Sequence, residues 1–210
     1  MMLEVEVISI EIIKPSSSTP DHLRHHKLSF LDYQLAPPVY NHMVFFYPCD
    51  HEINSVEVLS DHLKQSLCDV LTCFYPLAGR IKGNATFVDC DDQGVPFMEA
   101  TVKCQLSQLL ENPIPAQLNK LLLFELDGVQ ELPLGVQFNS FDCGGVGIGA
   151  CISHFVGDAL SFFTFMRCWA AYSASGEAQD LMRVEFVSDT LFPPRNLSGY
   201  QLAIKKVINK

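Results

Sequence analysis

A continuous apolar segment, followed by a short turn and a helix-forming segment, is the feature that most constrains the fold of this chain. Residues Val146–Ile152 carry an apolar side chain or glycine at every position, which is typical of a buried strand. Residues 159–171 then favour a helix, and His154 and Asp158 lie in the turn between the two. Because the strand and the helix are rigid and the turn is open, such junctions often present side chains to ligands.

His154 is therefore the first candidate functional residue, since imidazole is well matched to taking up a proton near neutral pH. A lone histidine after an apolar strand has a second interpretation, as a core residue that is held by hydrogen bonds. From the residues alone, both interpretations stay open.

Length and composition indicate a globular chain with a sizeable core. The 210 residues are 48% hydrophobic, which fits one domain or slightly more. The net charge of -10 argues against a nucleic-acid partner, because such partners are bound through clustered lysine and arginine. Acidic residues at the amino terminus and the lack of an apolar run of ~18 to 20 residues predict no signal peptide and no membrane attachment. We therefore expect a cytoplasmic protein.

Eight cysteines are spread along the chain, and no two of them are spaced as Cys-x-x-Cys. Without a secretion signal we expect them to be reduced, and we predict no metal site. Cys143 and Cys151, which lie near His154 in the sequence, are expected to be buried in adjacent strands.

Periodicity and turn residues predict alternating strands and helices. A helix with one apolar face is expected over Val56–Phe74 and ended by Pro76, and a short helix over 106–110. A third helix, over 159–171, is expected to be capped by Asp158 and to pack inward through Leu160, Phe163, Phe165, Met166, Trp169 and Ala170. Strands are expected over 4–13, 43–47, 97–102, 133–141 and 146–153, the last two joined by a hairpin at Asp142-Cys143-Gly144-Gly145.

Three motifs, taken in this order, closely resemble the plant BAHD acyltransferases. They are Tyr75-Pro76-Leu77-Ala78-Gly79-Arg80, the hairpin Phe141-Asp142-Cys143-Gly144-Gly145, and Ser153-His154-Phe155-Val156-Gly157-Asp158-Ala159-Leu160-Ser161. The resemblance runs from about residue 4 to Arg195 and is nearest to the branch that contains vinorine synthase.

The resemblance implies an α/β fold like chloramphenicol acetyltransferase, with a mixed sheet flanked by helices and an active-site channel between two similar halves. This sequence matches the amino-terminal half, and the family's second signature, Asp-Phe-Gly-Trp-Gly, is absent. We therefore expect residues 1–190 to form the amino-terminal domain and residues 191–210 to be a truncated crossover linker, with the second domain missing.

The resemblance also assigns a reaction. It implies that His154 acts as a general base on the hydroxyl or amine of a plant secondary metabolite, which then attacks the thioester of an acyl-coenzyme A. Acetyl-coenzyme A is the expected co-substrate, and no cofactor is expected to stay bound.

Asp158 has two interpretations, either as the partner that orients the imidazole or as the cap of the following helix. We favour the cap, and the resemblance implies that this carboxylate turns away from the substrate to pair with an arginine of the second half. Gly157 is expected to let the backbone turn tightly beside the base. The segment Tyr75–Arg80 favours a helix end that leads into a strand over a phosphate-binding loop.

By resemblance, five further residues line the acceptor side of the channel, namely Ser29, Asp32, Tyr40, Asn41 and His42. His22, His25 and His26 lie in a polar segment and are expected to be solvated. Two functional hypotheses follow. The chain is the base-bearing half of an acyltransferase, or it is a catalytically inactive half that acts through a partner such as the missing half, because a channel wall would otherwise be exposed as an apolar surface.

Overall fold

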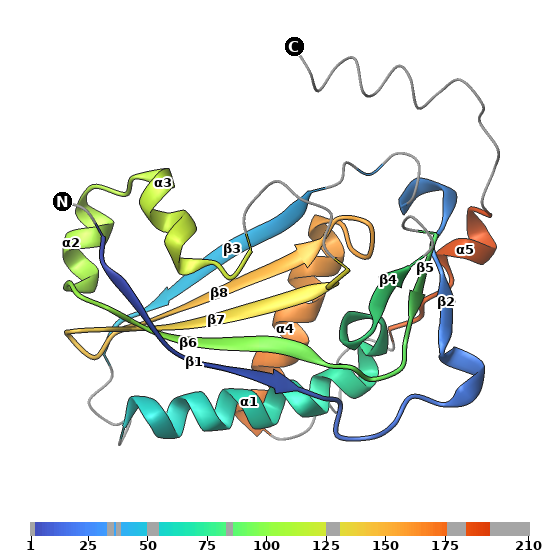
Figure 1. Cartoon of the computed structure of the whole chain (residues 1–210), viewed down its shortest axis with the longest axis horizontal. Helices are drawn as coiled ribbons and strands as arrows, with labels where there is room; N and C mark the ends of the chain where they lie inside the picture. Colours follow the sequence, from blue (N-terminus) through green and yellow to red (C-terminus); the bar gives the residue numbers. More distant parts are fainter. Residues whose placement is uncertain are drawn as a thin grey trace, which may run out of the picture.

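The computed structural model describes residues 3–32, 36, 39–49, 55–82, 86–124, 131–175 and 184–193. A five-stranded sheet forms the centre, with the strand order β1-β6-β7-β8-β3, and a three-stranded sheet with the order β2-β5-β4 lies beside it (Figure 1). The strands of the large sheet are β1 (Val5–Ile13), β3 (Tyr40–Tyr47), β6 (Val95–Val102), β7 (Leu134–Phe141) and β8 (Val146–Ser153). Those of the small sheet are β2 (His25–Lys27), β4 (Arg80–Lys82) and β5 (Phe87–Asp89).

The helices include two long ones, α1 (Val56–Cys73) and α4 (Ala159–Ser175). The short ones are α2 (Leu106–Glu111), α3 (Pro115–Leu118) and α5 (Ser188–Leu191), with 3-10 turns η1 (Asp21–Leu23), η3 (Tyr75–Ala78) and η4 (Asn119–Leu121). Within the described residues, no helix combines the length and the apolar character that crossing a membrane requires.

The large sheet is mixed. Strands β6 and β7 run parallel, and the other pairings among its described strands are antiparallel. The crossover between β6 and β7 contains α2, α3 and η4. The predicted strands are confirmed within one or two residues, except that β3 begins three residues earlier than expected, at Tyr40.

The hairpin between β7 and β8 is confirmed. The amide of Phe141 donates to the carbonyl of Gly145 over 2.9 Å, and Gly144 has a φ of +78°. A residue with a side chain rarely adopts this backbone conformation, so glycine is required at this position.

Strand β8 is buried at all eight positions, as its continuous apolar sequence predicts. Val146, Ile148, Ala150 and Ile152 pack into the main core, to which α1 and α4 also contribute. On the opposite face, the carbonyl of Leu121 in η4 lies 2.1 Å from the point where a Cβ atom of Gly149 would be. The glycine therefore lets the crossover pass directly over the strand.

Two buried amides of β7 hold this crossover in place. The Gln137 side chain donates to the carbonyl of Lys120 over 3.0 Å, and the Asn139 side chain donates to the carbonyl of Leu121 over 3.1 Å. The Gln137 amide also donates to Asn139 Oδ1 over 2.8 Å. Because both side chains find partners, their burial leaves no amide group unsatisfied.

Helix α1 matches its prediction within one residue, and Ser55 caps it by accepting a hydrogen bond from the amide of Val58. Helix α4 packs differently from the prediction. Its buried residues are Phe162, Phe165, Cys168 and Trp169, whereas Leu160 is 75% exposed and Phe163 is 43% exposed. The inward orientation predicted for Leu160, Phe163 and Ala170, which is also exposed, was wrong, because apolar residues occur on more than one side of this helix and the sequence does not say which side meets the sheet.

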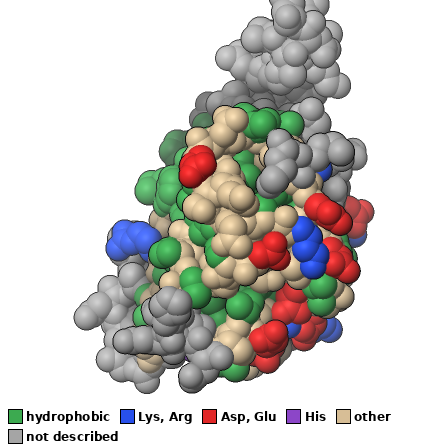
Figure 2. All heavy atoms as spheres, turned by 90° about the vertical axis from the view of Figure 1, so that its left-hand side faces the viewer, with side chains coloured by type: hydrophobic (Ala, Val, Ile, Leu, Met, Phe, Trp, Pro, Cys, Tyr) green, Lys and Arg blue, Asp and Glu red, His purple; other side chains and the backbone are tan. Residues whose placement is uncertain are grey.

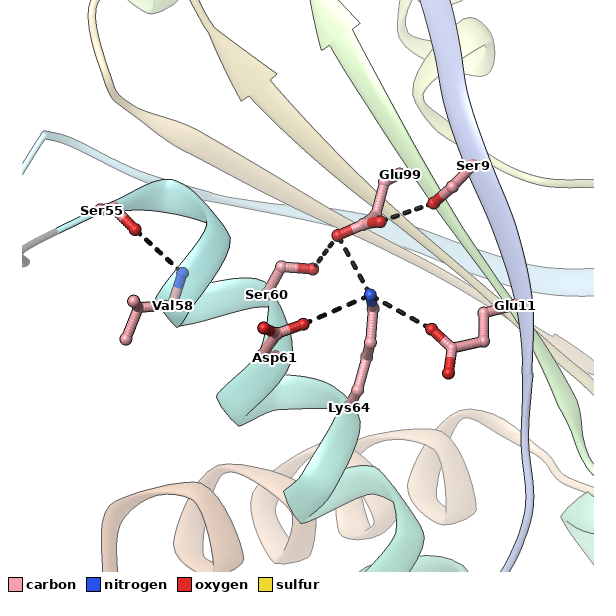
Figure 3. A network of polar contacts seen from close by, with 8 residues as sticks. All are labelled: Ser9, Glu11, Ser55, Val58, Ser60, Asp61, Lys64 and Glu99. Carbon is pink, nitrogen blue, oxygen red and sulfur yellow. Dashed lines mark hydrogen bonds and ion pairs between the residues drawn. The ribbon is translucent and has the colours of Figure 1, made fainter.

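Helix α1 is joined to the sheet by the Glu99 network, which consists of Ser9, Glu11, Ser60, Lys64 and Glu99 (Figure 3). Glu99 accepts hydrogen bonds from the hydroxyls of Ser9 and Ser60, and its carboxylate lies 3.3 Å from the Lys64 ammonium. Burial opposes ionisation of Glu99, but the hydrogen bonds from these three neighbours hold its pKa below the usual value. Burial likewise opposes the charge of Lys64, and hydrogen bonds to Glu11 and Glu99 raise its pKa.

The surface carries charged side chains in groups. On the face drawn in Figure 2, acidic and basic side chains gather along one side, and hydrophobic side chains are scattered over the rest. Lys103 lies 3.5 Å from Glu6 in one exposed ion pair. All eight cysteines are free. Cys151 is fully buried, and burial raises its pKa to about 11, whereas Cys143 is half-buried.

Candidate active site

A cavity of about 550 Å³ lies beside the junction of β8 and α4. Its walls also come from β2, from Ser29, Leu31, Asp32 and Ala36, and from the segment 184–192. Most of the lining is apolar, with Ile152, Val156, Leu160 and Phe186 among its residues, and a few polar groups interrupt it. This volume and composition are typical of a pocket for a small organic molecule.

His154 lies in the wall of this cavity, directly after β8. Its amide donates to the carbonyl of Val39 over 2.9 Å, and the turn behind it closes through hydrogen bonds from Val156 and Gly157 to the carbonyl of Ser153. The backbone therefore fixes the histidine between a strand and a helix.

The imidazole Nδ1 of His154 is buried and has no hydrogen-bond partner among the described residues. A buried polar atom without a partner costs free energy, so such atoms are rare in folded proteins and need an explanation. A core histidine held by hydrogen bonds would not have this atom unpaired. Nδ1 is too buried to meet a ligand itself, but the residue lines the cavity and is not held by a hydrogen bond at this atom.

Asp158 caps α4, as predicted. Its Oδ1 accepts hydrogen bonds from the amide and the hydroxyl of Ser161, each over 2.8 Å, and its carbonyl accepts from the amide of Phe162. The hydrogen bond from the Ser161 amide, helped by the Ser161 hydroxyl and the charge of His154, holds the pKa of Asp158 below its usual value. The residue is exposed, so its carboxylate keeps solvent contact without the arginine that the resemblance implies.

Gly157 is required for a different reason from the one predicted. Its φ lies outside the left-handed region, but an added Cβ atom would lie 3.2 Å from the Cβ of Ser161 and 3.3 Å from the Cγ2 of Ile152. Its carbonyl also accepts a hydrogen bond from the Asn41 side chain over 2.9 Å. Close packing of the turn, rather than backbone conformation, explains the glycine.

The structure brings two of the five expected acceptor-side residues into the cavity. Ser29 and Asp32 belong to its lining. The hydroxyl and the amide of Ser29 donate to Asp32 Oδ2 over 2.6 and 3.0 Å, and the Ser188 hydroxyl donates to the same oxygen over 3.3 Å.

The other three, Tyr40, Asn41 and His42, are not part of the described lining. Tyr40 donates to the carbonyl of Leu132 over 2.9 Å and packs on Phe124, and His42 Nδ1 lies 3.0 Å from the carbonyl of Tyr40. Successive strand residues point to opposite faces, so His42 shares the face of Tyr40. Asn41 takes the other face and holds the turn at Gly157.

His26 was missed by the sequence analysis. It was expected to be solvated, but it lies on β2, is 9% exposed and lines the cavity together with His154. Its ring packs edge-on against Phe186 and Tyr75, with centroid distances of 5.6 and 6.4 Å. Burial lowers the pKa of His26, against the opposing charges of Asp189 and Asp32. His22 and His25 are exposed, as predicted.

The segment 184–192 supplies a second unexpected wall. Phe186 packs against Phe74 and Tyr75, and the amide of Phe30 donates to the carbonyl of Phe192 over 2.8 Å. Phe192 of the predicted linker therefore contacts the domain, and residues 194–210 lie outside the described residues.

The segment Tyr75–Arg80 has a structural role, as expected. It forms η3 and leads into β4, and the Arg80 guanidinium donates to the carbonyls of Gly79 and Gly94 over 2.7 and 2.8 Å. Among the described residues, no group of histidine, cysteine and acidic side chains could hold a metal ion.

Sequence comparisons agree with this architecture. A model of the family described as the Transferase family matches residues 3–205. Stemmadenine O-acetyltransferase from Catharanthus roseus is 42% identical over 203 residues, and the match covers 92% of this chain and 47% of the relative. Vinorine synthase from Rauvolfia serpentina is 40% identical over 205 residues, with 92% and 47% covered. The chain therefore belongs to the Transferase family of BAHD acyltransferases.

Solved structures confirm the fold class. The crystal structure of vinorine synthase matches with a TM-score of 0.83 at 40% identity, covering 92% of this chain and 48% of that chain. A TRI101 structure from F. sporotrichioides, complexed with coenzyme A and T-2, matches with a TM-score of 0.60 at 14% identity, which shows a shared fold alone. The chain spans about half the length of the curated relatives that it matches.

Proposed function

We propose that this chain is the base-bearing half of an acyl-coenzyme A-dependent acyltransferase, with His154 as the general base. The acceptor is a hydroxyl or an amine of a plant secondary metabolite, and acetyl-coenzyme A is the donor. The observation that carries the proposal is the position of His154 in the wall of a largely apolar cavity, with no described residue hydrogen-bonded to its buried Nδ1. Family membership and the acetyltransferase activity named for one relative, stemmadenine O-acetyltransferase, support it.

A hydroxyl that keeps its proton is a weak nucleophile, so the reaction needs a base. His154 removes the acceptor proton as the acceptor oxygen forms a bond to the thioester carbonyl carbon, and the negative charge moves to the carbonyl oxygen. Collapse of this intermediate breaks the carbon–sulfur bond, and the coenzyme A thiolate leaves with the proton from the imidazolium. General base catalysis of this kind is worth ~100 to 10,000-fold in rate.

The remaining residues of the site position the base. Asp158 caps α4, Gly157 allows the close turn, and Asn41 ties this turn to β3. We further propose that residues 1–190 act as the amino-terminal domain, that residues 191–210 form a crossover, and that the protein works in the cytoplasm.

The test is acyl transfer by the protein at its natural length, purified from its source or expressed from its transcript. His154→Ala should abolish thioester consumption with a panel of alcohols, and Thr164→Ala, in the same cavity wall, is the matched control. Undiminished turnover by H154A would overturn the mechanism.

A second candidate function is supported by the exposed apolar residues of α4. Leu160 is 75% exposed and Phe163 is 43% exposed, and a chain acting without catalysis would bind a partner through such a surface. The intact mass of the native protein, captured with an antibody against residues 55–75, separates the two candidates. A mass of 23.5 kDa without acyl transfer supports the second candidate, and a monomeric, active protein of this mass would exclude it.

A further inference from the structure

Apart from two histidines, the ionisable side chains in the described lining of the cavity are all acidic. Asp32, Asp158 and Glu185 contribute carboxylates, and no lysine or arginine belongs to the described lining. An anionic ligand would meet like charge in a largely apolar space, which is unfavourable. The cavity is therefore suited to a neutral or positively charged ligand.

One of these carboxylates has an unused oxygen. All three hydrogen bonds that Asp32 accepts reach Oδ2, from the Ser29 amide, the Ser29 hydroxyl and the Ser188 hydroxyl. Oδ1 accepts none from the described residues. The donors thus fix the orientation of the carboxylate, and no donor among the described residues occupies Oδ1.

His26 provides a second, independent indication of a ligand at this end of the cavity. Its side chain is nine-tenths buried and lines the cavity, and its ring nitrogens make no hydrogen bond to a described residue. The flanking rings of Tyr75 and Phe186 hold it in place. Burial lowers the pKa of His26 and so favours its neutral form, and a neutral imidazole offers a nitrogen that accepts a hydrogen bond.

We propose that His26 and Asp32 form a recognition site for a protonated amine of the acceptor molecule. The ammonium N–H would donate a hydrogen bond to Asp32 Oδ1 or to the imidazole nitrogen of His26, with the other group beside the cation, and the aromatic ring of Phe186 adds a favourable surface for a cation. The inference rests on the proposed function and deepens it. The acceptor class is an alcohol that carries a basic amine, with its hydroxyl directed to His154.

The test is direct binding to the 210-residue chain, measured by calorimetry with three probes of matched shape. Quinuclidinol carries a protonated amine, bicyclooctanol is its neutral carbon isostere, and bicyclooctane carboxylic acid is ionised at neutral pH. We expect quinuclidinol to bind on the order of 10-fold more tightly than the isostere, and the carboxylate to bind most weakly. Any other order of affinities would overturn the proposal.

Two variants locate the effect. Asp32→Asn keeps an oxygen for the Ser29 donors and should remove the preference for quinuclidinol, with binding of bicyclooctanol unchanged. His26→Phe should weaken quinuclidinol binding several-fold and leave bicyclooctanol binding intact, which also covers the case that D32N does not fold. Equal losses for both probes in H26F would contradict a role in amine recognition.

The outcome is separable from that of the proposed function, because binding requires no acyl transfer. His154→Gln should leave the preference for the amine unchanged. A preserved preference together with undiminished turnover by the His154 variant would refute the base and keep the amine site. The reverse result would keep the base and refute the amine site.

Discussion

The two main polar clusters of the molecule differ in how completely their hydrogen-bonding groups are used. In the Glu99 network, both oxygens of Glu99 accept hydrogen bonds and Lys64 lies near three carboxylates (Figure 3). In the cavity, His154 Nδ1, the ring of His26 and Oδ1 of Asp32 have no hydrogen-bond partner among the described residues. A cluster whose partners are complete stabilises the fold, and one whose partners are incomplete is prepared for a ligand.

The largest effect is expected from removing the base. His154→Gln should lower acyl transfer by about 100- to 10,000-fold, because the acceptor keeps its proton. The free energy of unfolding, measured with urea, should change little, because Nδ1 makes no hydrogen bond to lose. A large loss of stability would mean that His154 stabilises the fold, as the residues of the Glu99 network do.

The opposite pattern is expected for the Glu99 network. Glu99→Gln removes the negative charge at the centre of the half-buried Glu99 network and should destabilise the fold by about 2 kcal/mol. Glu6→Gln is the matched control, because its pair with Lys103 is exposed and should cost about 0.5 kcal/mol or less. Urea unfolding of both variants measures the difference, and equal values would contradict a special role for Glu99.

A smaller effect is expected at the helix cap. Asp158→Ala should destabilise the fold by about 1 kcal/mol, because the amide of Ser161 loses its acceptor. Asp158→Asn keeps an oxygen at the cap and should change stability much less. If the asparagine variant lost as much stability as the alanine variant, the charge and not the hydrogen bond would be the important feature.

The smallest effect is a change in the dependence of stability on pH. The pKa of His26 is lowered in the folded state, so below its ordinary value of 6.5 the unfolded chain binds more protons. This contribution to stability is present above pH 6.5 and is lost as the pH falls through the folded pKa. Glu99 also has a lowered pKa, but its contribution is lost only below its ordinary value of 4.5.

The two pH windows can be separated by mutation. His26→Phe should flatten the curve of unfolding free energy against pH just below pH 6.5, and Glu99→Gln should flatten it below pH 4.5. Urea titrations at closely spaced pH values test both. An unchanged curve for H26F would mean that the pKa of His26 is the same in the folded and unfolded states.

Long segments with a clear pattern could be predicted from the sequence. The buried strand Val146–Ser153 and the helix Val56–Cys73 have signals that extend over many residues, and the motifs around them predicted the family. The cap at Asp158 was also predicted, because capping depends on neighbouring residues alone.

Features that depend on distant partners could not be predicted. His26 is buried because β2 pairs with β5, where Val88 is its neighbour, and a three-residue strand has no periodicity that shows this. Lys64 and Glu99 meet only when α1 packs on the sheet. Tyr40 and His42 lie on a face of the sheet that was not predicted. Strand β3 begins earlier than its β-branched and aromatic residues indicate, and its alternation decides the face of each residue.

The pairing of β3 with β8 has a consequence for the order of events during synthesis. Tyr40 lies opposite Ser153 and Tyr47 lies opposite Val146. Among the described strands β3 pairs only with β8, so this pairing cannot be completed until residue 153 has left the ribosome. Contacts between such distant residues form slowly, and an unpaired strand is exposed to other chains meanwhile. The turn that carries His154 is thus completed by the same late event that closes the sheet.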